Sequence, residues 1–312
     1  MTLTKDAPLM TTTRKSSALD RFLANPVLTA ELRHQWYILE KSRSGRGWIA
    51  IAVLMLVPAI LASLVYFIGG VIGWSAMPTI PQLDRGLLHQ VFTIGLLLMI
   101  TMNVALYAVV ILITLGLSAA SITREKTGKT WESLLLTNID SRRIVLGKWW
   151  ASMLALWGDH LMIGLLRLGM VAWVIVAFAQ NRGLPDAPFG LSIGLGYVLP
   201  LVIIASLYTF LDATFTAAIG VAIPLSEWSG TVVAAVVLAV RLTATAAAVW
   251  WFWGLIGLIR TYGGVAYLPF ALAGLGVCVF VTIAMLRLAM FMAVRAQVSP
   301  PDTTQSLPQS LN

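Results

Sequence analysis

Six apolar runs dominate this sequence, and each is long enough to cross a lipid bilayer as a single helix. A spanning helix needs about 20 mostly apolar residues to cover the hydrocarbon core. The runs lie at approximately residues 48–72, 88–117, 150–178, 191–223, 231–259 and 265–292. Only 11% of the 312 residues are charged, against about 25% in soluble domains. The sequence therefore predicts an all-α polytopic membrane protein with six transmembrane helices.

The distribution of basic residues predicts how these helices are oriented. Lysines and arginines gather before the first run and between the second and third, whereas the opposite side receives only Arg85, Arg182 and Arg260. Positively charged segments stay in the cytoplasm, so we expect both termini there, in a multi-pass protein of the plasma (inner) membrane. The net charge of +8 follows from this orientation and gives no reason to expect nucleic acid as a partner.

A charged stretch at residues 118–150 separates the second and third runs. Within it Trp131, Leu134, Leu135 and Ile139 recur at helical spacing, which predicts a short helix with one apolar face. Asp140 can cap the helix that follows, as can the serine after it. The periodicity leaves two interpretations open: a helix that rests on the lipid interface, or a docking helix for a soluble partner.

The residue order in this stretch carries more information than its periodicity. Residues 122–126 read ITREK, residues 128–137 read GKTWESLLLT and residues 141–148 read SRRIVLGK. This order resembles the cytoplasmic segment between the second and third spans of ABC type 2 exporter permeases, the transmembrane subunits of ABC transporters. Asn138 stands where that family commonly has proline, and Lys129 is inserted before the threonine.

The resemblance implies a coupling helix within residues 119–143 that seats on a separate ATP-binding subunit. The residues it assigns to ATPase coupling are Glu125, Thr130, Trp131, Glu132, Leu134 and Leu135.

A second resemblance lies before the first run. Asn25 and Pro26 form a helix-start signal, and the opening that they begin, with Glu31 and Arg33, is similar to the elbow helix of the same family. Apolar periodicity puts Leu28, Gln35 and Leu39 on one face of this interfacial helix; Glu31 and Arg33 fall on or beside the other face. The predicted layout is a disordered cytoplasmic tail (1–24), an elbow helix (25–47), a six-span permease domain (48–292) and a cytoplasmic C-terminal tail (293–312).

Ionisable residues inside the runs form a candidate polar cluster. Asp159, Asp212 and Arg241 come to a similar depth, about 15 to 18 Å from the cytoplasmic ends at the helical rise per residue, and charges in a membrane commonly pair. They either tie spans three, four and five together or give a polar lining to a substrate path. Arg167 falls nearer the outer face, and we expect it to extend towards that face.

The sequence gives little support for chemistry within this chain. Gly128, Lys129 and Thr130 look like the end of a phosphate-binding loop, but the preceding glycine and strand are missing. Asp159 and His160 are adjacent on a helix and point about 100° apart. We therefore expect no catalytic, cofactor or metal residues here, and we expect ATP and Mg²⁺ on a partner subunit.

The function implied by the resemblance is that of a membrane-spanning permease subunit of an ATP-driven exporter. Such a subunit pairs with a second permease, identical or related, and with ATP-binding subunits. The alternative is a non-transporting membrane anchor or scaffold of a larger complex that retains the permease fold. The sequence does not indicate a substrate.

Overall fold

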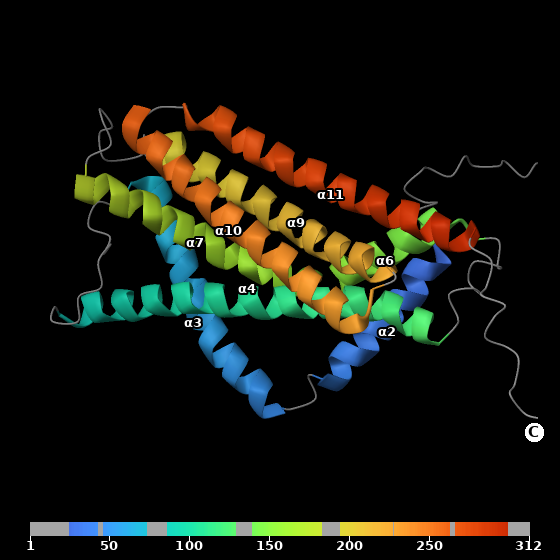
Figure 1. The fold of residues 1–312 in the computed structure, drawn as a ribbon. Coiled ribbons are helices and arrows are strands. Elements are labelled where there is room, and N and C mark those ends of the chain that lie inside the picture. Colours follow the sequence, from blue (N-terminus) through green and yellow to red (C-terminus); the bar gives the residue numbers. More distant parts are fainter. Residues whose placement is uncertain are drawn as a thin grey trace, which may run out of the picture.

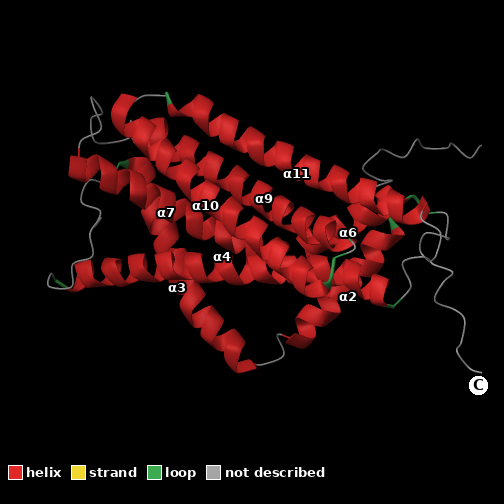
Figure 2. Ribbon diagram, in the orientation of Figure 1, coloured by secondary structure: helices red, strands yellow, loops and turns green. Residues whose placement is uncertain are grey.

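The chain is described by a computed structural model over residues 25–42, 46–73, 86–128, 139–182, 194–226, 228–262 and 266–298. The helices are α2 (Pro26–Ser42), α3 (Arg46–Ile72), α4 (Leu87–Thr127), α6 (Ser141–Ala155), α7 (Trp157–Arg182), α9 (Leu199–Ala222), α10 (Gly230–Tyr262) and α11 (Tyr267–Val298). A π-helical turn, η1 (Gly194–Val198), and a 3-10 turn, η2 (Ile223–Leu225), flank α9. Six of these helices are long and apolar enough to cross a membrane, so the predicted all-α polytopic membrane fold is confirmed (Figure 2).

Helices α7, α9, α10 and α11 run in similar directions, whereas the shorter helices α2 and α6 gather at one end of the bundle (Figure 1). At that end α2 and α6 lie beside the C-terminal ends of α4 and α11, and we call it the base. From the base α3 diverges from α2 and crosses the bundle, where it packs mainly on α7 and α4. The base therefore collects segments that are far apart in the sequence.

Two helices differ from the predicted spans in a way that bears on function. α4 continues past the predicted end at residue 117 to Thr127, because its last turns bury Ser118, Ser121 and Ile122 against the base. The third span begins later than predicted: α6 ends at Ala155, α7 starts at Trp157, and Leu156 stands between them. The predicted third span therefore belongs to two helices.

The C-terminal boundary also differs. α11 remains helical to Val298, so the tail predicted from residue 293 begins inside this helix. The tail predicted at residues 1–24 lies outside the described residues, as does the segment 299–312.

The crossing of α3 and α7 depends on small residues. A Cβ on Gly169 would overlap the Cα and the carbonyl oxygen of Ser63, and one on Gly70 would lie 2.9 Å from Cβ of Ala172. The Gly169 N–H donates to Oγ of Ser63 over 2.9 Å. Small residues let two membrane helices approach until their backbones touch, and this contact fixes α3 against the bundle.

The base has its own apolar core. Ile122 of α4, Ile144 and Val145 of α6, Val221 of α9 and Ala289 of α11 are buried there together. Elsewhere the outward surface of the long helices is strongly apolar, as with Phe280, which is 72% exposed. Such a surface suits contact with lipid, while the buried core at the base makes α2 and α6 part of the bundle.

Candidate functional site

A fully buried lysine joins three helices at the base. Lys148 of α6 has no exposed side-chain surface. Its Nζ donates to Oε2 of Glu31 over 3.1 Å, to Oε1 of Glu125 over 2.6 Å and to the carbonyl oxygen of Ser121 over 3.0 Å. An ammonium group carries three N–H donors, so these three acceptors satisfy it. Lys148 therefore connects α2 with the end of α4 through α6.

Glu31 is the counterpart of Lys148 on α2. Its Oε2 also accepts from Nη2 of Arg124 over 3.0 Å, and its Oε1 accepts from Nε2 of Gln35 over 3.2 Å. Burial by itself raises the pKa of the Glu31 carboxyl, but the Lys148 and Arg124 charges and the hydrogen bonds of Lys148 and Gln35 outweigh burial. The net pKa of Glu31 is lowered, so the carboxylate is ionised at neutral pH.

The position of Glu31 corrects the sequence interpretation of α2. Apolar periodicity placed it on or beside the outer face, yet it is only 5% exposed, on the buried stripe with Leu28, Gln35 and Leu39. The physical reason is that two basic partners and one amide compensate its charge. Trp36, which apolar periodicity also places on the face with Leu28, is 54% exposed, in keeping with the preference of indoles for a membrane interface.

Gln35 completes this group of contacts. Its Nε2 donates to Oγ of Ser152 on α6 over 3.1 Å, and that hydroxyl donates to the carbonyl oxygen of Lys148. We call Glu31, Gln35, Arg124, Glu125, Lys148 and Ser152 the basal cluster. A further link runs to η2, because Nζ of Lys126 donates to the carbonyl oxygens of Pro224 in η2 and of Ser226 just after it. The basal cluster therefore lies within a connected base.

Local sequence explains how α2 and α6 meet. Asn25 caps α2, since its Oδ1 accepts from the Val27 N–H over 3.1 Å, and its Nδ2 donates to the Arg143 carbonyl over 2.9 Å. Asp140 caps α6 through its Oδ1, which accepts from the N–H of Arg142 over 3.0 Å. A Cβ on Gly147 would lie 2.9 Å from Nδ2 of Asn25, so this glycine permits the close approach of the two helices.

Most of the residues predicted to contact an ATP-binding subunit lie outside the described residues. These are Thr130, Trp131, Glu132, Leu134 and Leu135. Glu125 is described, and its carboxylate is engaged by Lys148 inside the chain. Of the predicted elbow residues, Asn25 and Glu31 are buried in the contact with α6, while Pro26 and Arg33 are exposed. The segment 129–138 joins α4 to α6, and both of these helices contribute residues to the basal cluster.

A second polar group lies within the membrane-spanning part. Nη2 of Arg241 on α10 donates to both carboxylate oxygens of Asp212 on α9, over 2.7 and 2.8 Å. The hydroxyl of Tyr107 accepts from Arg241 over 2.7 Å and donates to Asp212 over 3.1 Å, while the hydroxyl of Tyr208 donates to Asp212 over 3.2 Å. Asp159 is partly exposed in the first turn of α7, and it takes no part in this ion pair.

The side chain of Arg167 turns into the bundle and not towards the outer face. It was expected to extend to the outer face, but its Nη1 donates to Oγ1 of Thr209 over 2.7 Å. Its guanidinium carbon lies 4.7 Å from the ring centre of Tyr107 and 5.7 Å from that of Tyr208. Aromatic faces attract guanidinium groups at such distances. The sequence signal that could have identified these partners is a tyrosine in the middle of an apolar run.

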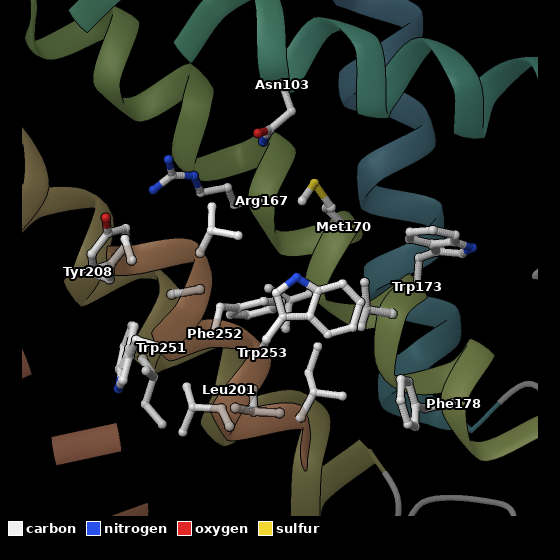
Figure 3. Close-up of a pocket in the computed structure, with 18 of the residues that line it drawn as sticks. Asn103, Arg167, Met170, Trp173, Phe178, Leu201, Tyr208, Trp251, Phe252 and Trp253 are labelled. Atoms are coloured by element: carbon white, nitrogen blue, oxygen red, sulfur yellow. The ribbon is translucent and has the colours of Figure 1, made fainter. Parts of the chain in front are cut away.

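A cavity of about 1100 Å³ begins at Arg167. Residues of α4, α7, α9 and α10 line it. The polar residues at one end are Asn103, Tyr107, Arg167 and Tyr208, and the apolar wall includes Met170, Trp173, Phe178, Leu201, Phe252 and Trp253. Figure 3 shows the Asn103 amide pointing towards α7 between Arg167 and Met170, with Trp253 reaching across the cavity.

The cavity opens on the side of the bundle. Val104 and Trp253, which line it, are 60% and 63% exposed. Arg260 lines the far end and is also exposed. Asp212 and Arg241 do not line the cavity; they lie behind the tyrosines that do. The cavity is therefore largely apolar, with a basic and amide-bearing inner end.

Comparisons of the chain with protein-family models, with curated proteins and with solved structures found no match. The fold and the sites together define a polytopic helical membrane protein with a laterally open cavity.

Proposed function

We propose that this chain is the membrane-spanning permease subunit of an ATP-driven exporter of the ABC type 2 class. The ATP and Mg²⁺ belong to a separate subunit that docks below the base. The observation that carries the proposal is the bridge made by buried Lys148 between Glu31 and Glu125. Six membrane-length helices and the residue order at positions 122–148 support the same assignment.

The bridge matters because of where the segment 129–138 is attached. One end follows α4 and the other leads into α6, and both helices contribute to the basal cluster. A force applied to this segment therefore acts on α2, α4 and α6 together. Leaving one charge of such a buried ion pair without its partner costs about 3 to 5 kcal/mol, so we expect the three helices to move as one body.

The helices that leave the base continue to the cavity. α4 supplies Asn103 and Tyr107, and α7, which follows α6, supplies Arg167. Movement of α4 and α7 relative to α10 would change the width of the cavity. On this proposal the base faces the cytoplasm, both termini lie there, and a second permease, identical or related, pairs with this chain in the plasma (inner) membrane.

Co-purification in a mild detergent tests the proposal. We expect an ATP-binding subunit to accompany the wild-type chain and to be lost from Glu132→Lys. In this variant the positive charge of lysine replaces a carboxylate that contacts the partner, and attraction becomes repulsion. The matched control is Glu40→Lys on the exposed face of α2, which should retain the partner. Hydrolysis of ATP by the purified complex should follow the same order.

The scaffold alternative predicts a different result. In that case the chain co-purifies in fixed stoichiometry with an assembly that has no ATP-binding subunit, and the purified assembly does not hydrolyse ATP. That outcome would contradict the exporter proposal and would make this chain a membrane anchor.

A further inference from the structure

Two groups at the inner end of the cavity have unmet hydrogen-bonding or charge requirements. Asn103 is 5% exposed, and its Nδ2 has no hydrogen-bond partner among the described residues. An amide nitrogen is only a donor, and a buried donor without a partner costs about 1 to 3 kcal/mol. Asn103 lines the cavity and its amide ends between Arg167 and Met170 (Figure 3), so an acceptor bound in the cavity beside Arg167 would satisfy this donor.

Arg167 adds a positive charge beside that amide. In the part of the chain that the structure describes, its contacts are a threonine hydroxyl and two tyrosine rings, and no carboxylate pairs with it. The nearby carboxylate of Asp212 is already bound by Arg241. Both charged residues that line the cavity, Arg167 and Arg260, are arginines. The cavity therefore favours an anion over a cation.

The remaining wall determines what the anion is attached to. Beyond Arg167 the cavity is bounded by Met170, Trp173, Phe178 and Trp253, which offer no charge to a ligand. Binding cavities for drug-sized molecules occupy about 300 to 1,000 Å³, so a volume of about 1100 Å³ accepts a molecule with a sizeable apolar body. The side opening lets such a molecule enter from the bilayer.

We propose that this cavity is a binding site for an amphipathic anion, with its acidic headgroup at Arg167 and Asn103 and its apolar body along Trp173, Phe178 and Trp253. The binding claim rests on the cavity alone. The further statement that the anion is exported cargo rests on the proposed function. An acidic membrane lipid and a free single-chain amphiphile share this chemistry, and the test separates them.

The test measures equilibrium binding of dodecyl phosphate to the purified chain in dodecyl maltoside micelles. Dodecyltrimethylammonium, which has the same tail, is the cationic comparison. The detergent carries the same dodecyl tail on a neutral headgroup and is present in excess. A difference in affinity between the two probes therefore reports their headgroups. We expect the phosphate to bind about tenfold or more tightly than the cation, since hydrogen bonds to charged groups contribute about 1.5 to 3 kcal/mol.

Variants locate the headgroup. Arg167→Gln should weaken phosphate binding about tenfold or more, and Arg167→Lys should restore part of the loss. The matched control is Arg287→Gln, an exposed arginine on α11 that does not line the cavity, and it should bind as the wild type does. Ala177→Trp fills the cavity while leaving every charge in place, so it tests the site even if Arg167→Gln does not fold.

Three results would overturn the proposal. The first is equal affinity for the anionic and cationic probes, and the second is unchanged binding in Arg167→Gln or in Ala177→Trp. The third is loss of binding in Arg260→Gln alone, which would put the headgroup at the outer end. If phosphatidylglycerol displaces the probe, the natural occupant is an acidic lipid; if it does not, the occupant is a single-chain amphiphile. Because the chain is tested without any partner, these results are independent of the co-purification experiment.

Discussion

Asp212 and Arg241 face each other across α9 and α10, with the guanidinium Nη2 at 2.7 and 2.8 Å from the two carboxylate oxygens. Both residues are almost fully buried. Charges buried in a membrane protein are costly to leave without a partner, so this ion pair is one of the contacts that hold α10 on α9.

Asp212→Leu is expected to lower the free energy of unfolding by about 3 to 5 kcal/mol, because it leaves a buried arginine without its carboxylate. The double variant Asp212→Leu with Arg241→Met should recover much of that loss. Thermal unfolding of the purified chain in detergent measures both. A double variant no more stable than the single one would contradict the assignment of the loss to an unpaired charge.

Lys148→Met keeps the length of the side chain but removes the ammonium group from the basal cluster. We expect a loss of about 3 to 5 kcal/mol, since Glu31 and Glu125 would lose their shared buried partner. Adding Glu125→Gln should restore part of the stability, because Glu31 retains Arg124. Lys41→Met, at an exposed position of α2, is the control and should change little. Limited proteolysis near residues 129–138 offers a local readout.

Acidification should weaken the base through Glu31. The pKa of this carboxyl is lowered from an ordinary value of 4.5, so its ionisation stabilises the folded state above that pH. The contribution is lost as pH falls through the lower, folded-state pKa. We expect the unfolding temperature to fall between about pH 5 and about pH 3, and Glu31→Gln to show a smaller fall over that range. Glu40→Gln is the exposed comparison on the same helix, and an identical slope in all three proteins would contradict this account.

Gly169→Ala tests the crossing of α3 and α7. The new Cβ would overlap the backbone of Ser63, so the helices must separate, at a cost of about 1 to 3 kcal/mol. Gly164→Ala on the same helix is the matched control, because nothing lies within 4 Å of its added Cβ; its greater helix propensity should leave stability equal or slightly higher. Equal unfolding temperatures for the two variants would exclude a close crossing at Gly169.

The apolar runs alone were enough to predict the six membrane helices. A run of apolar residues of that length has few other stable structures, so local sequence determines it. The start of α2 was also readable, because Asn25 and Pro26 act on residues next to them. These features depend on neighbours in the chain.

Counting depth along the helices grouped Asp212 with Arg241, which do pair, but the partners of Glu31, Lys148 and Arg167 were not readable in this way. Glu31 and Lys148 are 117 positions apart, and helical periodicity counts apolar residues, so it assigns a buried carboxylate to the wrong face. The depth of Arg167 could be counted along its helix, but its turn towards Tyr107 and Tyr208 depends on where α4 and α9 lie. The helix break at Leu156 is not marked by a proline in the sequence. Tertiary packing decides all three.

The lateral opening beside Val104 and Trp253 affects how any occupant of the cavity is concentrated. A molecule that enters there comes from the bilayer, so the concentration that governs its binding is its mole fraction among the lipids. Each added methylene raises partitioning into lipid by about 0.8 kcal/mol before the protein contributes anything. A longer tail thus increases occupancy of the cavity by raising the concentration of the molecule in the bilayer. Discrimination between headgroups depends on Asn103 and Arg167.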